Sequence, residues 1–215
     1  MLRNKIYMNE ILLRYFPDIT ENQVQQFEKM ATLYQELNEK VNVVSRKDID
    51  NIFVNHILHS LAIAKYIKFT PESHVIDLGT GGGLPGLPLA VFFPNVNFHL
   101  IDRIGKKVAV AKEIAAQLGL KNVTFQHGDM GECKEKADFV ISRAVTDQST
   151  LVKISRKNIS DKQRNAIPNG LITLKGGELS TELGKNAKIT EVVNIADYFS
   201  EPFFETKKIV FTPIS

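Results

Sequence analysis

The chain has 215 residues, of which 43% are hydrophobic and 24% are charged, and this composition is typical of a folded globular protein. Its single cysteine, Cys133, excludes an internal disulfide and a four-cysteine zinc site. No apolar run approaches the roughly 20 residues of a membrane span, and the N-terminal residues are too polar for a signal-peptide core. We therefore expect a cytoplasmic protein without a membrane partner.

The positive charge of the chain is unevenly distributed. The formal net charge is only +3, so the protein as a whole is not a polycation. Lysine and arginine nevertheless outnumber acidic residues in two segments, 103–121 and 151–188. Such segments attract polyanions such as nucleic acids, although lysine-rich helix faces that contact only solvent give the same pattern.

Residues 1 to about 69 carry apolar side chains at helical spacing, which predicts a helical N-terminal extension. A short helix is expected near residues 4–15. The sequence Thr20-Glu21-Asn22-Gln23 is typical of a capping box that starts a second helix, and Asp48 is expected to cap a third. No flexible linker follows residue 69, so we expect the extension to pack against the rest of the chain.

After residue 73, short strand-like runs alternate with helical stretches, which predicts an α/β fold with helices on both faces of a parallel sheet. Two further strand-like runs near the C-terminus have no helical pattern between them and predict an antiparallel hairpin. Residues 70–215 are therefore expected to form a seven-stranded, mainly parallel, Rossmann-like domain. The expected strands are residues 74–78, 96–101, 123–125, 139–141, 171–174, 189–195 and 208–212, and the expected helices are residues 87–93, 106–118 and 148–157.

The strongest motif is a glycine-rich loop that follows an expected strand and opens an expected helix. It reads Asp77-Leu78-Gly79-Thr80-Gly81-Gly82-Gly83-Leu84-Pro85-Gly86. Glycines let a backbone turn tightly and approach a ligand without Cβ clashes, and a helix N-terminus favours negative charge. The loop therefore predicts a ligand site rather than a plain turn.

Two cofactors fit this loop. Gly81-x-Gly83-x-x-Gly86 matches the dinucleotide fingerprint, and Asp102 ends the next strand, where it can accept hydrogen bonds from ribose hydroxyls. These features would suit NAD and a nicotinamide-dependent oxidoreductase. The form Asp77-x-Gly79-x-Gly81-x-Gly83, together with the terminal hairpin, is typical of class I methyltransferases that bind S-adenosylmethionine, which is the interpretation we favour.

Several short motifs occur together, in order, over nearly the whole chain. They are Leu37-Asn38 with Asn42, His56-Ile57-Leu58-x-Ser60-Leu61, Asp77 through Pro88, Asp102-x-x-x-Lys106-Lys107, Leu118-x-Leu120-x-Asn122-Val123, Ser142-Arg143-Ala144 and Leu174-Lys175-Gly176. In this set the chain resembles the RsmG (GidB) family of bacterial 16S ribosomal RNA guanine-N7 methyltransferases. The resemblance implies S-adenosylmethionine as cofactor, and 16S ribosomal RNA or the small ribosomal subunit as partner.

The resemblance also implies which residues form the site. In the glycine-rich loop, Gly79 and Leu84 would contact the cofactor, and filling Gly81 with a side chain would block it. Asp102 would hold the ribose, and Arg143 would lie where the cofactor meets the target base. Met130 and Gly131 would lie beside the adenine.

Three positions depart from the family pattern. His59 stands where aspartate is usual, Asn42-Val43-Val44-Ser45 stands where Asn-Leu-Thr is common, and Gly128-Asp129-Met130-Gly131-Glu132 lacks an expected arginine. Asp129 could instead contact the adenine amino group. These departures leave open a catalytically inactive relative that binds ribosomal RNA.

The chemistry of guanine N7 needs no general base, because its free lone pair can attack a methyl group without loss of a proton. In agreement, we find no Ser-His-Asp set and expect no metal. Arg143 is the first candidate to bind guanine O6, and Lys175 is the second. We expect Lys106, Lys107, His56 and Lys175 to contact RNA, and the protein to be a monomer. Two alternatives stay open: Arg143 could pair with Asp77 or Asp129, and His56 could be a core residue.

Overall fold

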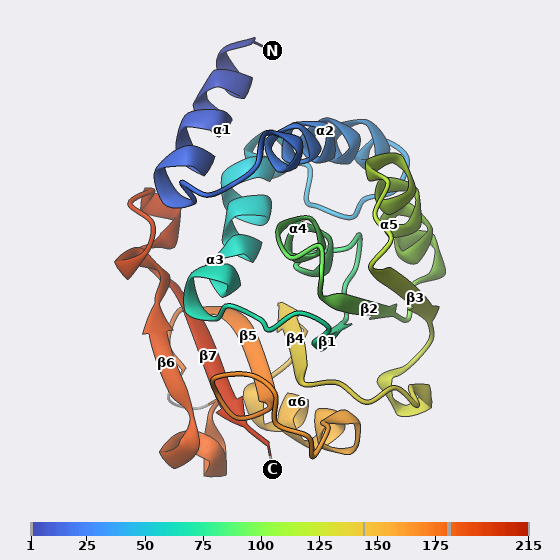
Figure 1. Ribbon diagram of the computed structural model, residues 1–215, viewed down its shortest axis with the longest axis vertical. Helices are drawn as coiled ribbons and strands as arrows, with labels where there is room; N and C mark the ends of the chain where they lie inside the picture. The colour runs from blue at the N-terminus through green and yellow to red at the C-terminus, as the bar shows by residue number, and fades with distance from the viewer. Residues whose placement is uncertain (1, 144, 180–181, 215) are drawn as a thin grey trace.

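The structure is a computed structural model that describes residues 2–143, 145–179 and 182–214, with side chains from residue 6 onward except that of Lys185. Seven strands of these residues form one sheet in the order β3-β2-β1-β4-β5-β7-β6 (Figure 1). The strands are β1 (His74–Leu78), β2 (Asn97–Asp102), β3 (Val123–His127), β4 (Phe139–Arg143), β5 (Gly170–Gly176), β6 (Glu191–Asn194) and β7 (Lys207–Pro213).

Six of the strands point in one direction, and the last strand, β7, runs opposite to them. β1 pairs in parallel with both β2 and β4, and β5 pairs in parallel with β4. β7 pairs antiparallel with both β5 and β6, so it lies between them. Only short 3-10 turns occur between β6 and β7, at Ile195–Asp197 and Pro202–Phe204. The predicted mainly parallel, seven-stranded sheet with a terminal antiparallel hairpin is confirmed.

The helices cover both faces of the sheet. Figure 1 shows α2, α3, α4 and α5 on one side and α6 on the other. Each face has its own apolar core: Phe27, Leu61 and Leu87 belong to one, and Val140 and Leu151 belong to the other. Burial on both faces is what parallel strands require. The helices are α1 (Leu2–Tyr15), α2 (Glu21–Asn38), α3 (His59–Tyr66), α4 (Gly86–Phe92), α5 (Gly105–Leu118) and α6 (Gln148–Ser155).

The N-terminal helices share a core with the sheet domain. Phe27 and Tyr34 of α2 are fully buried in the same apolar cluster as Ile114 of α5. At α2, the Thr20 side chain accepts from the Gln23 backbone and the Gln23 side chain accepts from the Thr20 backbone, so the predicted capping box is confirmed. No helix of the described residues is both long and apolar enough to cross a membrane. The prediction that the extension packs against the rest is confirmed.

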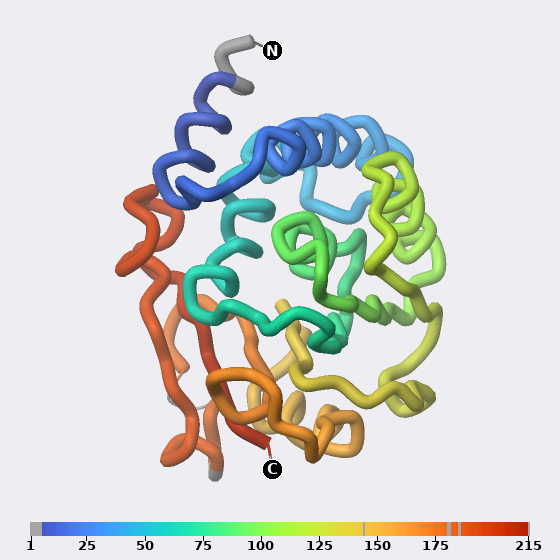
Figure 2. The backbone as a smooth tube through the Cα atoms, viewed as in Figure 1, coloured from blue at the N-terminus to red at the C-terminus, as the bar shows by residue number. Residues whose placement is uncertain are grey.

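The end of α1 contacts the segment between β6 and β7, as the blue and red parts of the tube show (Figure 2). The Tyr15 ring lies 4.7 Å from the Phe199 ring, centroid to centroid. Its hydroxyl hydrogen-bonds to Ser200 Oγ at 2.9 Å and donates to the Glu201 carboxylate. The end of α1 and the segment between β6 and β7 are therefore fastened to each other on one flank of the molecule.

The third N-terminal helix differs from the prediction. A 3-10 turn at Ile49–Asn51 is followed by a π-helix at Phe53–Leu58, and only then by α3. Asp48 does not cap this segment, and that expectation was wrong. Its carboxylate instead accepts hydrogen bonds from the Asn55 amide and the His56 ring, each at 2.6 Å. These side-chain donors take the place of the backbone N–H groups that a capping residue would bind.

Candidate active site

A cavity of about 1250 Å³ opens at the carboxyl ends of the strands. Leu78 of β1, Asp102 of β2, Arg143 of β4 and Leu174 of β5 all line it. The chain crosses from β1 to β2 on one side and reaches β4 on the other, so the cavity lies where the strand order reverses, the usual ligand site of such sheets. Its volume exceeds the ~300–1,000 Å³ typical of a single small ligand, which leaves room for a cofactor and a target base.

The glycine-rich loop forms one wall of the cavity. Gly81 has φ +57°, and a Cβ placed there would have no atom within 4 Å, so this position faces open space. Gly83 has φ +103°, and its Cβ would lie 2.4 Å from Leu87 Cδ1. Positive φ favours glycine at both positions, but Gly81 leaves room for a ligand whereas Gly83 permits close packing with α4.

Buried side chains hold this loop from below. Oδ2 of Asp77 accepts from Thr80 Oγ1 at 2.5 Å and from the Gly86 N–H at 2.8 Å, so one carboxyl ties both ends of the loop. Burial raises the pKa of Asp77 to about 7. The buried Tyr34 hydroxyl donates to the Gly82 carbonyl at 2.9 Å. The loop is therefore fixed in shape before a ligand binds.

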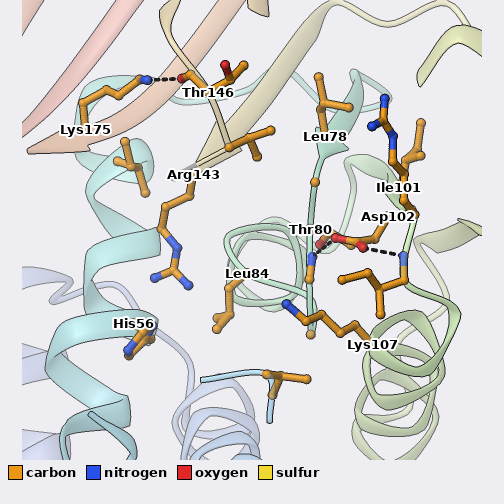
Figure 3. A pocket seen from close by; sticks show the side chains of 18 of the residues that line it. His56, Leu78, Thr80, Leu84, Ile101, Asp102, Lys107, Arg143, Thr146 and Lys175 are labelled. Atoms are coloured by element: carbon orange, nitrogen blue, oxygen red, sulfur yellow. Dashed lines mark hydrogen bonds between the residues drawn. The ribbon is translucent and has the colours of Figure 1, made fainter. Parts of the chain in front are cut away.

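Asp102 is held by backbone groups at the edge of the loop (Figure 3). Oδ2 accepts from the Gly81 N–H and Oδ1 accepts from the Ile104 N–H, both at 2.8 Å. Each oxygen keeps a second lone pair, and the residue lines the cavity. Ile104 lies beside it with 42% of its surface exposed, which is apolar surface that a ligand can cover.

The segment after β3 completes this side of the cavity. Asp129 Oδ1 accepts from the Gly131 N–H at 2.6 Å, and Oδ2 pairs with the Arg103 guanidinium. The Gly131 hydrogen bond and then Arg103 lower the pKa of Asp129. Met130 is buried and lines the cavity, whereas Gly131 acts through its backbone and is not among the lining residues. We call residues 79–84, Asp102, Asp129 and Met130 the loop half of the cavity.

The opposite side contains Arg143, which points into the cavity toward His56 (Figure 3). Among the described residues its guanidinium has no hydrogen bond or ion pair, so the alternative pairing with Asp77 or Asp129 was wrong. Burial lowers the pKa of Arg143, and electrostatic interactions with the acidic groups of Tyr34, Asp77 and Asp48 act against this shift. Ala144 of the Ser-Arg-Ala motif lies outside the described residues.

Lys175 and His56, which were expected to contact RNA, both have partners within the protein. Lys175 Nζ pairs with Glu182 at 2.8 Å and also donates to the Thr146 carbonyl, and the side chain is only 9% exposed. His56 hydrogen-bonds to Asp48 and is 13% exposed. We call Asp48, His56, Arg143 and Lys175 the side-chain half of the cavity.

The other lysines and the histidine singled out from the sequence lie in different places. Lys107 of α5 lines the cavity and Lys106 is exposed outside it. His59 is buried against Phe203 and Phe204, with ring centroids 5.5 and 6.0 Å away. No cluster of three His, Cys, Asp or Glu side chains that could bind a metal occurs in the part of the chain that the structure describes.

A family model described as rRNA small subunit methyltransferase G matches residues 23–209. The chain belongs to this family. It is 56% identical over 205 residues to ribosomal RNA small subunit methyltransferase G of Bacteroides thetaiotaomicron, covering 95% of this chain and 100% of the relative. Identity to the Porphyromonas gingivalis protein of the same name is 51% over 208 residues, covering 95% and 93%.

Solved methyltransferase structures share the fold. Precorrin-6y C5,15-methyltransferase from Geobacter metallireducens matches with a TM-score of 0.54 and 11% identity, over 74% of this chain and 88% of that chain. A SAM-dependent methyltransferase from Aquifex aeolicus matches with a TM-score of 0.50 and 16% identity, over 71% and 88%. The predicted family and the class I methyltransferase fold are confirmed, and neither the oxidoreductase nor the inactive relative is favoured.

Three residues of this cavity were not predicted from the sequence. Asp48 was assigned only to a helix cap, although it lines the cavity and holds His56. Arg103 follows Asp102 directly, so a cation at the end of the second strand was visible in the sequence, but its pairing with Asp129 was not. Glu182 pairs with Lys175 from seven residues away, and no motif in the sequence marked this pairing.

Proposed function

We propose that this chain transfers a methyl group from S-adenosylmethionine to N7 of one guanine in 16S ribosomal RNA. The observation that carries the proposal is a single cavity that joins a preformed glycine-rich loop to an arginine with no partner among the described residues. Membership of the rRNA small subunit methyltransferase G family supports the reaction and the substrate class. We expect the protein to act in the cytoplasm, as a monomer, on the small ribosomal subunit.

The loop half has the features that S-adenosylmethionine requires. Gly81 leaves open space beside the loop, and Asp102 keeps lone pairs for two ribose hydroxyls. Ile104 and the buried Met130 provide apolar surface for an adenine ring. When bound, the cofactor supplies a methyl group on a positively charged sulfur. When the methyl group is transferred, the sulfur keeps the electron pair of the broken sulfur–carbon bond. The residues that would hold it are Gly79, Gly81, Leu84, Asp102, Asp129, Met130, Gly131 and Arg143.

The side-chain half fits a guanine. N7 carries a lone pair that Watson–Crick pairing does not use, and no proton leaves N7 when this lone pair bonds to a methyl carbon. A general base is therefore unnecessary, and positioning and electrostatics supply the catalysis. O6 lies beside N7 on the same edge of guanine and accepts hydrogen bonds from arginine. Arg143 is the first donor to O6 because its guanidinium has no partner in the described part of the chain, and Lys175 is the second because Glu182 already binds it.

The base must leave its stack to reach this cavity. Lys107 lines the cavity and Lys106 beside it is exposed, which supports contacts of both with the phosphates that flank such a base. A cation at the start of α5 is unfavourable next to the helix dipole, which a bound phosphate would offset. We expect Lys106 and Lys107 to govern RNA affinity and its salt dependence.

The test is transfer of labelled methyl groups from S-adenosylmethionine to small subunits, and to naked 16S RNA, from a strain that lacks the enzyme. Borohydride and aniline treatment then cleaves the strand only at an N7-methylated guanosine. The proposal expects one specific cut, stronger on the better substrate. Label incorporation without a cut would contradict N7 as the acceptor, and binding of both ligands without incorporation would support an inactive relative.

A further inference from the structure

The cavity holds a second charged group opposite Arg143, the carboxylate of Asp48. Asp48 comes from the N-terminal extension, whereas Arg143 ends a central strand of the sheet. The charge of each acts on the pKa of the other, so the two groups lie within electrostatic range. Among the described residues they form no ion pair. An anion and a cation therefore line one cavity without neutralising each other by direct contact.

Local hydrogen bonds fix the protonation and direction of Asp48. Burial pushes its pKa up, but hydrogen bonds from Asn55 and His56 outweigh burial and lower the pKa. Burial and the Arg143 charge lower the pKa of His56 to about 4, so the ring is neutral near pH 7. A neutral ring facing a carboxylate must donate its Nε2 proton. Asp48 is thus an ionised, acceptor-only group whose position is set by two donors.

Asp48 still has capacity to accept further hydrogen bonds. Asn55 uses one lone pair of Oδ1, and His56 uses one lone pair of Oδ2. The side chain is 34% exposed and lines the cavity, so the other lone pairs are accessible to a ligand. The ligand that suits this site presents two adjacent N–H donors near an acceptor that Arg143 can bind.

We propose that Asp48 reads the Watson–Crick edge of the target guanine by accepting from N1–H and the 2-amino group, while Arg143 donates to O6. This inference rests on the function proposed above. Enzymes that extrude a base read it through this edge. Adenine has an acceptor at N1 and a donor at position 6, the reverse of guanine, so the same pair of side chains would reject it.

The same contact favours the reaction and not only binding. Methylation at N7 places a positive charge on the guanine ring system and makes N1–H more acidic. Its hydrogen bond to an ionised carboxylate therefore strengthens as the new bond forms, which is a contact realised most fully in the transition state. Loss of Asp48 should accordingly lower kcat as well as raise KM.

The test is a cycle that combines an enzyme variant with a substrate analogue. Small subunits are reconstituted on 16S RNA in which the mapped target guanosine is retained or replaced by inosine, which lacks the 2-amino group but keeps N7, O6 and N1–H. Wild type and Asp48→Asn are assayed on both. Asp50→Asn is the matched control, because Asp50 is an exposed acid of the same turn and does not line the cavity.

The expected results follow from loss of a charge-assisted hydrogen bond, worth roughly 10- to 100-fold. For wild type, replacing guanosine by inosine should lower kcat/KM about tenfold. On guanosine, Asp48→Asn should have a kcat/KM about 10- to 100-fold below that of wild type. For Asp48→Asn, replacing guanosine by inosine should lower kcat/KM by less than a further twofold. Asp50→Asn should behave as wild type, and all three proteins should bind S-adenosylmethionine equally.

Two results would overturn the inference. Wild type could methylate inosine as well as guanosine, or inosine could cost Asp48→Asn the same factor as wild type, which would show that Asp48 only holds His56 in place. Failure of the proposed function looks different, because wild type would then transfer no methyl group to the guanosine subunit at all.

Discussion

The two halves of the cavity are built in different ways. In the loop half, backbone groups after two neighbouring strands do most of the positioning: the N–H groups of Gly81, after β1, and of Ile104, after β2, fix Asp102. In the side-chain half, Asp48 and Arg143 lie almost a hundred residues apart in the chain and meet only because the N-terminal extension packs onto the sheet. We therefore expect the side-chain half, which is assembled from distant segments, to determine the choice of substrate.

The largest expected effect is in the side-chain half. Arg143→Ala should lower methyl transfer by about 100- to 1000-fold, the range seen when one donor to a reacting group is lost. The unfolding midpoint should stay unchanged or rise, since the guanidinium has no partner to lose among the residues that the structure describes. Steady-state transfer assays with urea unfolding as control would measure both. The methyl-transfer rate of Arg143→Lys should lie between those of wild type and Arg143→Ala, because lysine keeps the charge without the planar fork. A wild-type rate in Arg143→Ala would contradict a role of Arg143 in the site.

The next effect is in the loop half. Gly81→Val should weaken S-adenosylmethionine binding by about 100-fold or more, about 3 kcal/mol, because the side chain would occupy open space beside the loop. Gly119→Val is the matched control: Gly119 also has positive φ (+70°) and no atom within 4 Å of a built Cβ, yet it lies outside this cavity. Calorimetric titration should show normal affinity in the control. Equal loss in both variants would mean that backbone strain, not the ligand site, explains the result.

A smaller effect concerns the support of the loop by Asp77. Its raised pKa means that between about pH 4 and pH 7 the carboxyl is protonated in the folded protein and ionised in the unfolded chain. The folded state binds more protons in this window, so the unfolding free energy falls as pH rises. The stability of wild type relative to Asp77→Asn should decrease by about 2 kcal/mol from pH 5 to pH 8. Urea unfolding at both pH values tests this, and a constant difference would contradict it.

The smallest effect tests the contact between extension and loop. Tyr34→Phe removes the hydroxyl that donates to the Gly82 carbonyl and leaves that carbonyl without this partner. The unfolding free energy should drop by about 1 kcal/mol, and cofactor affinity should fall by less than tenfold. Tyr7→Phe is a suitable control because Tyr7 is exposed. An unchanged unfolding free energy would indicate that the extension does not support the loop through this bond.

That most residues of the loop half line one cavity could be predicted from the sequence, because they occupy fixed places in a strand-loop-helix unit. Asp102 follows from Asp77 since neighbouring parallel strands end at one edge of a sheet. The part played by Asp48 could not be predicted, because apolar spacing does not distinguish an α-helix from the π-helix at Phe53–Leu58. The position of β7 between β5 and β6 also depends on tertiary pairing that strand patterns alone do not specify.

The most direct test of the division of the cavity into a cofactor-binding loop half and a substrate-binding side-chain half is hydrogen exchange with saturating S-adenosylhomocysteine, followed by mass spectrometry of peptides. The account predicts slower exchange at residues 79–84, 102–104 and 129–131, and unchanged exchange at residues 48–58 until small subunits are added. Slower exchange at residues 48–58 with S-adenosylhomocysteine alone, and none in the glycine-rich loop, would contradict it.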